Sequence, residues 1–167
     1  SAYSYLGSTF CEGLGILCAN LLILGIVTFG FAYFYAGSFP FSFLQLCLAV
    51  ILGFFAGCLA LLFQMLIGIS AFWIQQVSPI HWIWEKLLFA LGGLMLPLAA
   101  YPAWIQKIAY LTPFPFILGE RSSFALDPSF SMFLQIISPL FIWGLLCIAS
   151  LLFLYRRGLK IVHIEGG

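Results

Sequence analysis

His81 and Glu85 are the two ionisable side chains of this sequence whose spacing could support acid–base chemistry. They are four residues apart, so on a helix they would share one face and could form a pH-sensitive pair. Two potential ligands are too few for a metal site. The flanking Trp82 and Trp84 place the pair at a membrane interface, where polar residues are expected. We therefore favour an ordinary interfacial position over a special chemical role.

The other reactive side chains form no catalytic set. The sequence contains no G-x-x-x-x-G-K-[ST] phosphate loop, no G-x-S-x-G elbow and no H-E-x-x-H zinc motif. Five cysteines lie in or beside apolar stretches without a C-x-x-C pair, which favours a role as small hydrophobes: Cys11, Cys18, Cys47, Cys58 and Cys147. We expect no enzyme activity of the chain itself, no bound cofactor and no metal.

The elements that carry these residues belong to a membrane protein. Residues 13–84 contain no Asp, Glu, Lys or Arg. A charge at the centre of a membrane helix costs about 2.5 to 3.5 kcal/mol, whereas a water-soluble helix of this length would show a charged face. Only 7% of the residues are charged and 64% are hydrophobic, and the net charge of +1 offers no basic surface for nucleic acid. The sequence therefore predicts an all-α integral membrane protein.

Four membrane spans are the simplest division of the chain. About 20 helical residues cross about 30 Å of hydrocarbon, so the uncharged run must contain at least two spans. A turn signal, Gly37-Ser38-Phe39-Pro40, separates the first two, and the polar break Gln75-Gln76-Val77-Ser78-Pro79 precedes the third. A second uncharged run near the C-terminus supplies the last. The predicted spans are residues 13–35, 42–72, 82–98 and 134–155 of a single transmembrane domain, 1–167.

Charge distribution predicts the orientation. Four Lys or Arg residues flank one side, against two on the other, Lys107 and Arg121. By the positive-inside rule the first side is cytoplasmic: Lys86, Arg156, Arg157 and Lys160. This orientation makes the tail, residues 156–167, cytoplasmic. The chain starts at Ser1 without a signal peptide, directly before a span that enters from the cytoplasm, which suggests that sequence upstream of Ser1 is missing.

The second predicted span carries a stripe of small residues at four-residue spacing. Ala49, Gly53 and Gly57 would lie on one face and let another helix approach closely. The partner is either another span of the same chain, which we favour because such stripes are widespread in membrane bundles, or a second subunit.

Between the third and fourth predicted spans the chain is apolar but repeatedly broken, at Gly92, Gly93, Pro97, Pro102, Pro113 and Pro115. Proline removes a backbone donor and clashes with the preceding turn, so no straight helix runs through this stretch. Broken backbone is tolerated at membrane depth only where protein or a water-filled cavity satisfies its hydrogen bonds. We therefore predict a re-entrant segment at residues 97–115, which either gates a substrate path or simply seals the outer end of the bundle.

A short interfacial helix is predicted after Pro102. One face would hold Trp104, Ile105, Ile108 and Leu111, while the residues turned away from it are Gln106, Lys107 and Tyr110. Trp104 would anchor the depth of this helix. Beyond it, Glu120 and Arg121 either form an ordinary surface ion pair, which we favour, or hold the re-entrant segment or the substrate.

This broken segment resembles the outer re-entrant segment of ABC-2 type transporter permeases, the membrane subunits of a large class of ABC exporters. The pattern that carries the resemblance is G-G-L-x-x-P-L-x-x-x-P-x-W-I-Q-x-I-A-x-L-T-P-F. Phe72-Trp73 resembles a pair that these permeases often carry before their fifth span. The C-terminal Arg156-Arg157-Gly158-Leu159-Lys160 with Gly166-Gly167 resembles their cytoplasmic tail. The order of these motifs relative to the spans makes the case.

The resemblance implies a transport subunit without its own ATPase site. A separate cytoplasmic ABC ATPase would bind ATP, two permease subunits would pair as a homo- or heterodimer, and the complex would lie in the plasma membrane, the inner membrane of a bacterium. The family has six spans, so this chain would hold the third to sixth. Candidate ATPase contacts are Glu12, Gln75, Gln76, His81, Glu85 and Lys86. Members often place an acidic residue where this chain has Gln75 and Gln76, which leaves an electrostatic contact there open.

The cargo expected from the residues is amphiphilic or lipid-like, because uncharged and aromatic groups would line the path. Two other function classes compete. A non-transport membrane scaffold would share the composition but would not need the proline-broken segment. An intramembrane enzyme fits least, because catalysis at bilayer depth needs converging ionisable groups, and the first, second and fourth spans have none.

Overall fold

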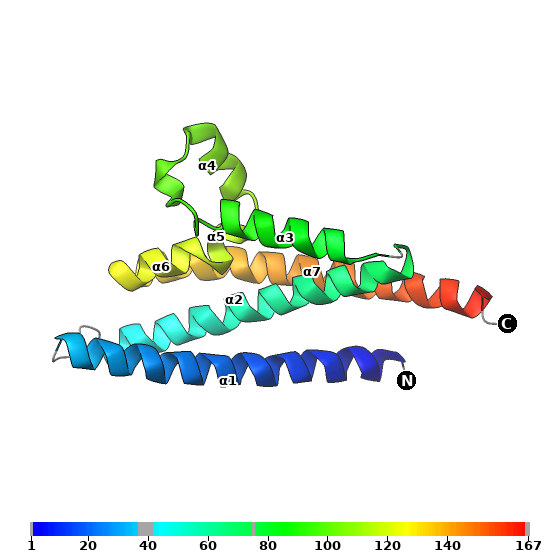
Figure 1. Cartoon of the computed structure of the whole chain (residues 1–167), viewed down its shortest axis with the longest axis horizontal. Helices are drawn as coiled ribbons and strands as arrows, with labels where there is room; N and C mark the ends of the chain where they lie inside the picture. The colour runs from blue at the N-terminus through cyan, green and yellow to red at the C-terminus, as the bar shows by residue number, and fades with distance from the viewer. Residues whose placement is uncertain (1, 37–41, 75, 166–167) are drawn as a thin grey trace.

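The structure of the chain is a computed structural model that describes residues 2–36, 42–74 and 76–165; of residues 2, 3, 5, 36 and 159–165 it describes the backbone alone. Every regular element in these residues is helical. Three helices dominate the molecule and run along its long axis: α1 (Ala2–Ala36), α2 (Phe43–Ile69) and α7 (Phe130–Glu165) (Figure 1). The predicted turn Gly37-Ser38-Phe39-Pro40 lies outside the described residues.

These three helices are long and apolar enough to cross a membrane. Their candidate spans are Leu6–Tyr35, Phe43–Phe72 and Phe130–Gly158, and the second includes the 3-10 turn η1 (Ser70–Phe72). The chain is therefore a helical membrane protein, as its charge-free runs predict. The predicted spans 13–35 and 134–155 fall inside these candidate spans, and the predicted span 42–72 starts one residue before its own.

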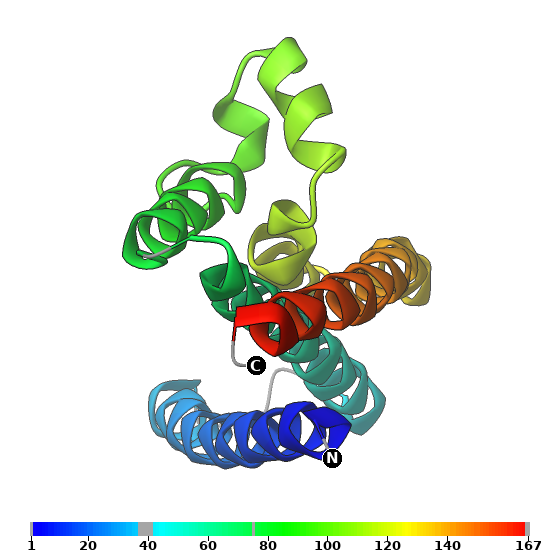
Figure 2. The same ribbon diagram turned by 90° about the vertical axis from the view of Figure 1, so that its right-hand side faces the viewer.

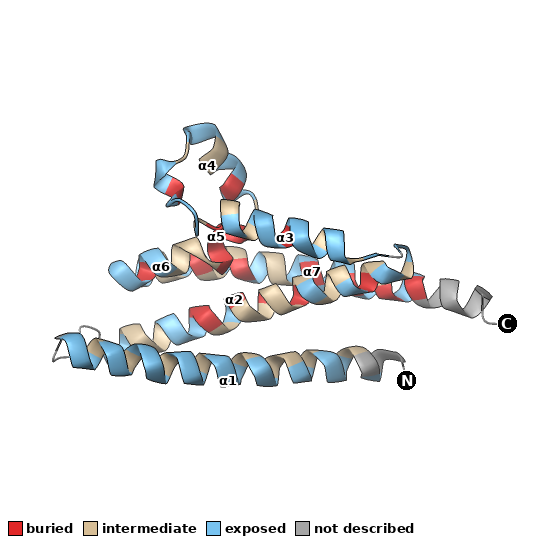
Figure 3. Ribbon diagram, in the orientation of Figure 1, coloured by how far each residue is buried: buried red, intermediate tan, exposed pale blue. Residues whose placement is uncertain are grey.

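Helix α2 lies at the centre of the bundle. It packs against α7 on one side and against α1 on the other, and α1 and α3 lie on opposite sides of it in both views (Figures 1 and 2). The buried residues of α2 face these neighbours, whereas α1 is exposed along most of its length (Figure 3). Because a bilayer is as apolar as the protein core, such an exposed apolar helix is compatible with lipid contact.

The helix at the predicted span 82–98 is shorter than a membrane span. Helix α3 (Ser78–Leu91) starts four residues earlier, with Pro79 in its first turn, and ends seven residues before position 98. Its 14 residues give about 21 Å of helix, less than the roughly 30 Å of hydrocarbon in a bilayer. The helix stops because Gly93 has a positive φ of 79°, a backbone conformation outside the α-helix.

The connection between α3 and α7 contains four short helical pieces: η2 (Leu98–Ala100), α4 (Ala103–Tyr110), α5 (Phe114–Ile117) and α6 (Gly119–Leu126). Helix α4 stands away from the bundle, while α5 returns to it (Figure 1). All four residues of α5 are buried, and α5 contacts α2, α3, α4, α6 and α7. The broken segment is therefore anchored in the core at α5.

An aromatic cluster at α5 joins three helices. Trp84 of α3 is stacked on Phe63 of α2, with ring centroids 4.5 Å apart, and lies 5.1 Å from the ring of Phe114 in α5. Trp84 is 8% exposed, whereas Trp82 is 61% exposed. The two side chains project about 200° apart on the helix, so Trp84 faces the core while Trp82 faces outward.

Candidate functional site

The backbone at Gly92, before the broken segment, lies close to the backbone at Gly119, after it. A Cβ at Gly119, the first residue of α6, would lie 2.7 Å from the carbonyl oxygen of Gly92, and a Cβ at Gly92 would collide with the carbonyl oxygen of Leu88. Leu118 also packs 3.2 Å from the Cβ position of Gly92. Gly92 is therefore buried at a contact between the end of α3 and the start of α6 that leaves no room for side chains.

The four prolines of the predicted re-entrant segment form two pairs. Pro97 and Pro102 are exposed, and each precedes a helical piece, η2 and α4. Pro113 and Pro115 are buried at the start of α5. Proline is tolerated in a first helical turn, where its missing N–H has no helical partner to lose. The prolines thus define where each short helix starts, and the second pair starts the one that enters the core.

Polar side chains tie the outlying helix α4 to its neighbours. Tyr101 donates a hydrogen bond to the carbonyl of Ala90 at 3.0 Å, and Gln106 donates one to the carbonyl of Tyr101 at 2.8 Å. Tyr110 donates to Glu120 at 2.6 Å and joins α4 to α6. The bonds of Tyr101 and Gln106 satisfy carbonyl groups of the broken backbone within the protein.

The apolar face predicted for α4 is only partly turned to the protein. Trp104, Ile108 and Leu111 are 64%, 50% and 77% exposed, while Ala109 is fully buried on the opposite side. Ile105 and Gln106 are intermediate. The exposed apolar stripe with Lys107 beside it has the character of an interfacial helix.

Tyr110 gives a testable pH dependence. Burial, the hydrogen bond to Glu120 and the negative charge of Glu120 together raise its pKa to about 12. The neutral phenol is favoured in the folded state, so its stabilising contribution is complete below about pH 10 and is lost as the pH rises through about 12. We expect Glu120→Gln to lower this pKa. The measurement is a near-ultraviolet absorbance titration, with Tyr110→Phe subtracted to isolate the one phenol. Ionisation of Tyr110 together with the other tyrosines in the parent protein would contradict it.

Glu120 and Arg121 do not form the surface ion pair that we favoured. Glu120 accepts the hydrogen bond from Tyr110, and Arg121 points instead to α2, where its Nη1 lies 3.5 Å from the carbonyl oxygen of Gly53. Adjacent residues on a helix project about 100° apart, which separates the two charges. The contact between Arg121 and Gly53 links the broken segment to the central helix.

The small-residue stripe of α2 faces α1. A Cβ at Gly57 would collide with Leu17, and a Cβ at Gly53 would lie 3.4 Å from Leu21. Gly53 and Gly57 therefore serve packing within the chain. Ala49 is exposed beyond this contact.

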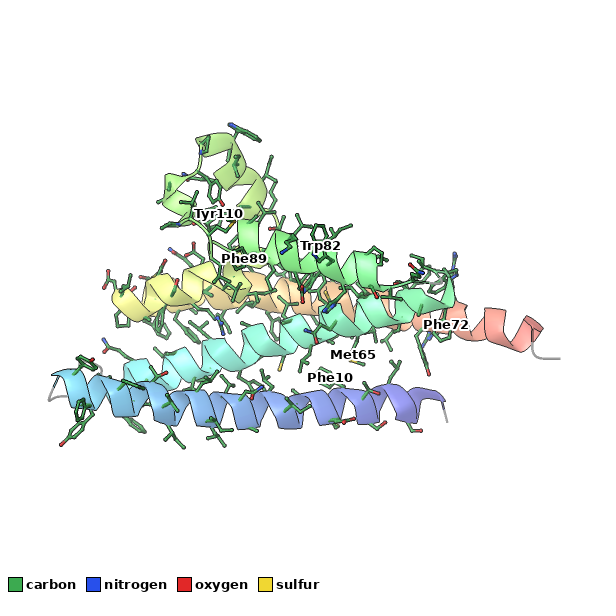
Figure 4. All side chains as sticks on the ribbon, in the orientation of Figure 1. Phe10, Met65, Phe72, Trp82, Phe89 and Tyr110 are labelled. Carbon is green, nitrogen blue, oxygen red and sulfur yellow. The ribbon has the colours of Figure 1, made fainter. Side chains whose placement is uncertain are left out.

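A groove of about 800 Å³ follows the same seam from Gly57 onward. It lies between α1 and α2, where Phe10 and Met65 face each other (Figure 4). Its walls are mostly apolar but include polar side chains, among them Glu12, Asn20 and Gln64. The volume is within the roughly 300 to 1,000 Å³ of small-molecule pockets.

Sequence reasoning assigned Glu12 to an ATPase contact and did not single out Asn20 or Gln64. The structure places Glu12 on the groove, on a different helix from the candidates in α3. A search for charged residues misses side-chain amides. Asn20 and Gln64 lie inside a run without charges, and that position was a signal for a polar feature within an apolar helix.

The remaining ATPase-contact candidates gather on α3. His81 Nε2 and Glu85 Oε1 lie 3.4 Å apart, so the predicted pair forms, with both side chains about half exposed. Lys86 lies over the ring of Trp82, 5.4 Å from its centroid. Gln76 is exposed just before the helix, and Gln75 lies outside the described residues. Within the described part of the chain no group of three His, Cys, Asp or Glu side chains could hold a metal ion.

Two motifs far apart in the sequence meet at the same end of the bundle. A Cβ at Gly158 of α7 would lie 2.5 Å from the ring of Phe72, and the ring of Tyr155 lies 6.4 Å from that ring. Phe72 belongs to the Phe-Trp pair and Gly158 to the basic motif. This contact holds the end of α2 against α7.

Protein-family models, curated proteins and solved structures give no match to this chain.

Proposed function

We propose that this protein is the membrane subunit of an ABC-2 type transporter, driven by a separate cytoplasmic ATPase and working with a second permease subunit. In this proposal it lies in the plasma membrane of a bacterium with its C-terminus in the cytoplasm. Its cargo is an amphiphilic or lipid-like molecule. Helix α3 forms the third of the four spans, and the connection after it forms the re-entrant segment.

The observation that carries the proposal is the fold of the broken segment. A loop that only capped a bundle would lie over it, whereas α5 is buried among α2, α3 and α7. Its prolines and the glycine contact between α3 and α6 keep irregular backbone inside protein. Irregular backbone at membrane depth that is buried in protein is characteristic of transporters and channels.

The groove between α1 and α2 supports the class of cargo. Its apolar walls suit an acyl chain, and Asn20 and Gln64 offer hydrogen bonds to a polar head. The exposed pair on α3, His81 and Glu85, offers a polar surface for the ATPase.

Purification of the tagged full-length protein in mild detergent tests the proposal. We expect an ATPase to co-purify with vanadate-sensitive hydrolysis. Replacing His81 and Glu85 with alanine should reduce the co-purified ATPase by about tenfold, the loss expected for one interface contact. Lys107→Gln, which removes an exposed charge from α4, is the control and should change nothing. If no ATPase is recovered in any of several detergents, the transport proposal is wrong and the chain is better explained as a membrane scaffold.

A further inference from the structure

Arg121 is a half-buried cation, and no salt bridge is found for it among the described residues. Its side chain runs from α6 to the seam between α1 and α2, where Nη1 lies 3.5 Å from the carbonyl oxygen of Gly53. Its Nε is buried and has no hydrogen-bond partner. The guanidinium lies against Gly53, with Nη1 3.7 Å from the Cβ position, an ordinary van der Waals distance.

Among the described side chains, no carboxylate forms a salt bridge with Arg121. Glu120 is engaged by Tyr110, and the ion pair found among the described residues is that of His81 with Glu85. Glu12 lies nine residues before Leu21 on α1, about 14 Å along the helix axis from the Gly53 contact. Burial lowers the pKa of Arg121, because desolvation disfavours the charged form.

A buried charge is costly unless it is paired and hydrogen-bonded. Guanidinium groups hold phosphate and carboxylate through charge-assisted hydrogen bonds, and the Nε of Arg121 has no hydrogen-bond partner in the protein. We propose that Arg121, at its contact with Gly53, is the binding group for the phosphate or carboxylate head of a membrane amphiphile.

The neighbouring groove explains why an amphiphile fits better than a small ion. The seam passes from Leu21 and Gly53 to Leu17 and Gly57, where the groove begins, one helical turn or about 5.4 Å further on. An anionic head at Arg121 therefore leaves its apolar tail beside an apolar groove. The site needs no ATPase, so it stands or falls separately from the transport proposal.

Lipid binding by the purified full-length protein in neutral detergent tests the site. The probes are phosphatidylglycerol, phosphatidylcholine with the same acyl chains, and inorganic phosphate, with bound lipid measured by native mass spectrometry and stability by thermal unfolding. We expect phosphatidylglycerol to bind about tenfold more tightly than phosphatidylcholine. Inorganic phosphate should give little stabilisation; if it reproduces the full effect, the anion site is supported and its ligand is a free anion.

Substitutions assign the effect to one guanidinium. Arg121→Gln should bring the two lipids to equal affinity, and Arg121→Lys should keep part of the preference, because it retains the charge but loses the bidentate geometry. Arg157→Gln removes an exposed arginine of α7 and should leave the preference unchanged. If the parent protein binds both lipids equally, the proposal is wrong. It is also wrong if folded Arg121→Gln still prefers phosphatidylglycerol as strongly as the parent protein does.

Discussion

Trp84→Ala should destabilise the protein by about 2 to 3 kcal/mol. Trp84 fills the space between Phe63 of α2 and Phe114 of α5, and it is the aromatic link between the central helix and the broken segment. Truncating a tryptophan in a water-soluble core costs about 3 to 5 kcal/mol. In a bilayer the transfer part is smaller, because lipid is as apolar as the core, so lost dispersion contacts and the cavity make up most of the effect.

Trp82→Ala is the matched control. Its side chain is 61% exposed, and Lys86 lies 5.4 Å from its ring, so we expect a loss below about 1 kcal/mol. The measurement is reversible unfolding in mixed micelles of mild detergent and dodecyl sulfate, followed by circular dichroism. Equal losses for the two tryptophans would show that α3 does not bury Trp84.

Gly119→Ala and Gly144→Ala should change stability in opposite directions. The new Cβ at Gly119 would lie 2.7 Å from the carbonyl oxygen of Gly92, so the contact between α3 and α6 must open, at a cost of about 1 to 3 kcal/mol. The Cβ at Gly144 meets nothing within 4 Å inside α7. Alanine there gains helix propensity and should stabilise by roughly 0.5 to 1 kcal/mol.

The same micelle titration measures both glycine variants. Because each adds one methyl group to a helix, the comparison separates the local contact from the general effect of alanine. Stabilisation by Gly119→Ala would contradict the close approach of the two backbones. Destabilisation by Gly144→Ala would place an unseen neighbour against that face of α7.

The sequence alone determined the class of the protein and most of its elements. Runs without charge predict helices long enough to cross a membrane, and three such helices are present. Glycine and proline predict where helices stop or start because they act on their own backbone: Pro102 precedes α4, and Pro113 precedes α5. The pairing of His81 with Glu85 follows from helical spacing alone.

The end of α3 shows how a local signal can be underestimated. Hydropathy continues past Gly92 and Gly93, so the sequence predicts a span that runs to residue 98 and stops at Pro97. The positive φ of Gly93 ends the helix at Leu91. The backbone contact of Gly92 with Gly119 adds to this local preference, and it depends on a residue 27 positions away.

Only the tertiary structure decided which residues meet. Trp84 packs in the core while Trp82 is exposed, Arg121 reaches Gly53 instead of Glu120, and Gly158 receives the ring of Phe72. In water, an apolar face marks the side of a helix that packs on protein. In a bilayer both lipid and protein are apolar, so hydropathy does not distinguish the two sides. Helix rotation and register then depend on shape complementarity between residues far apart in the chain, which a reading along the sequence does not contain.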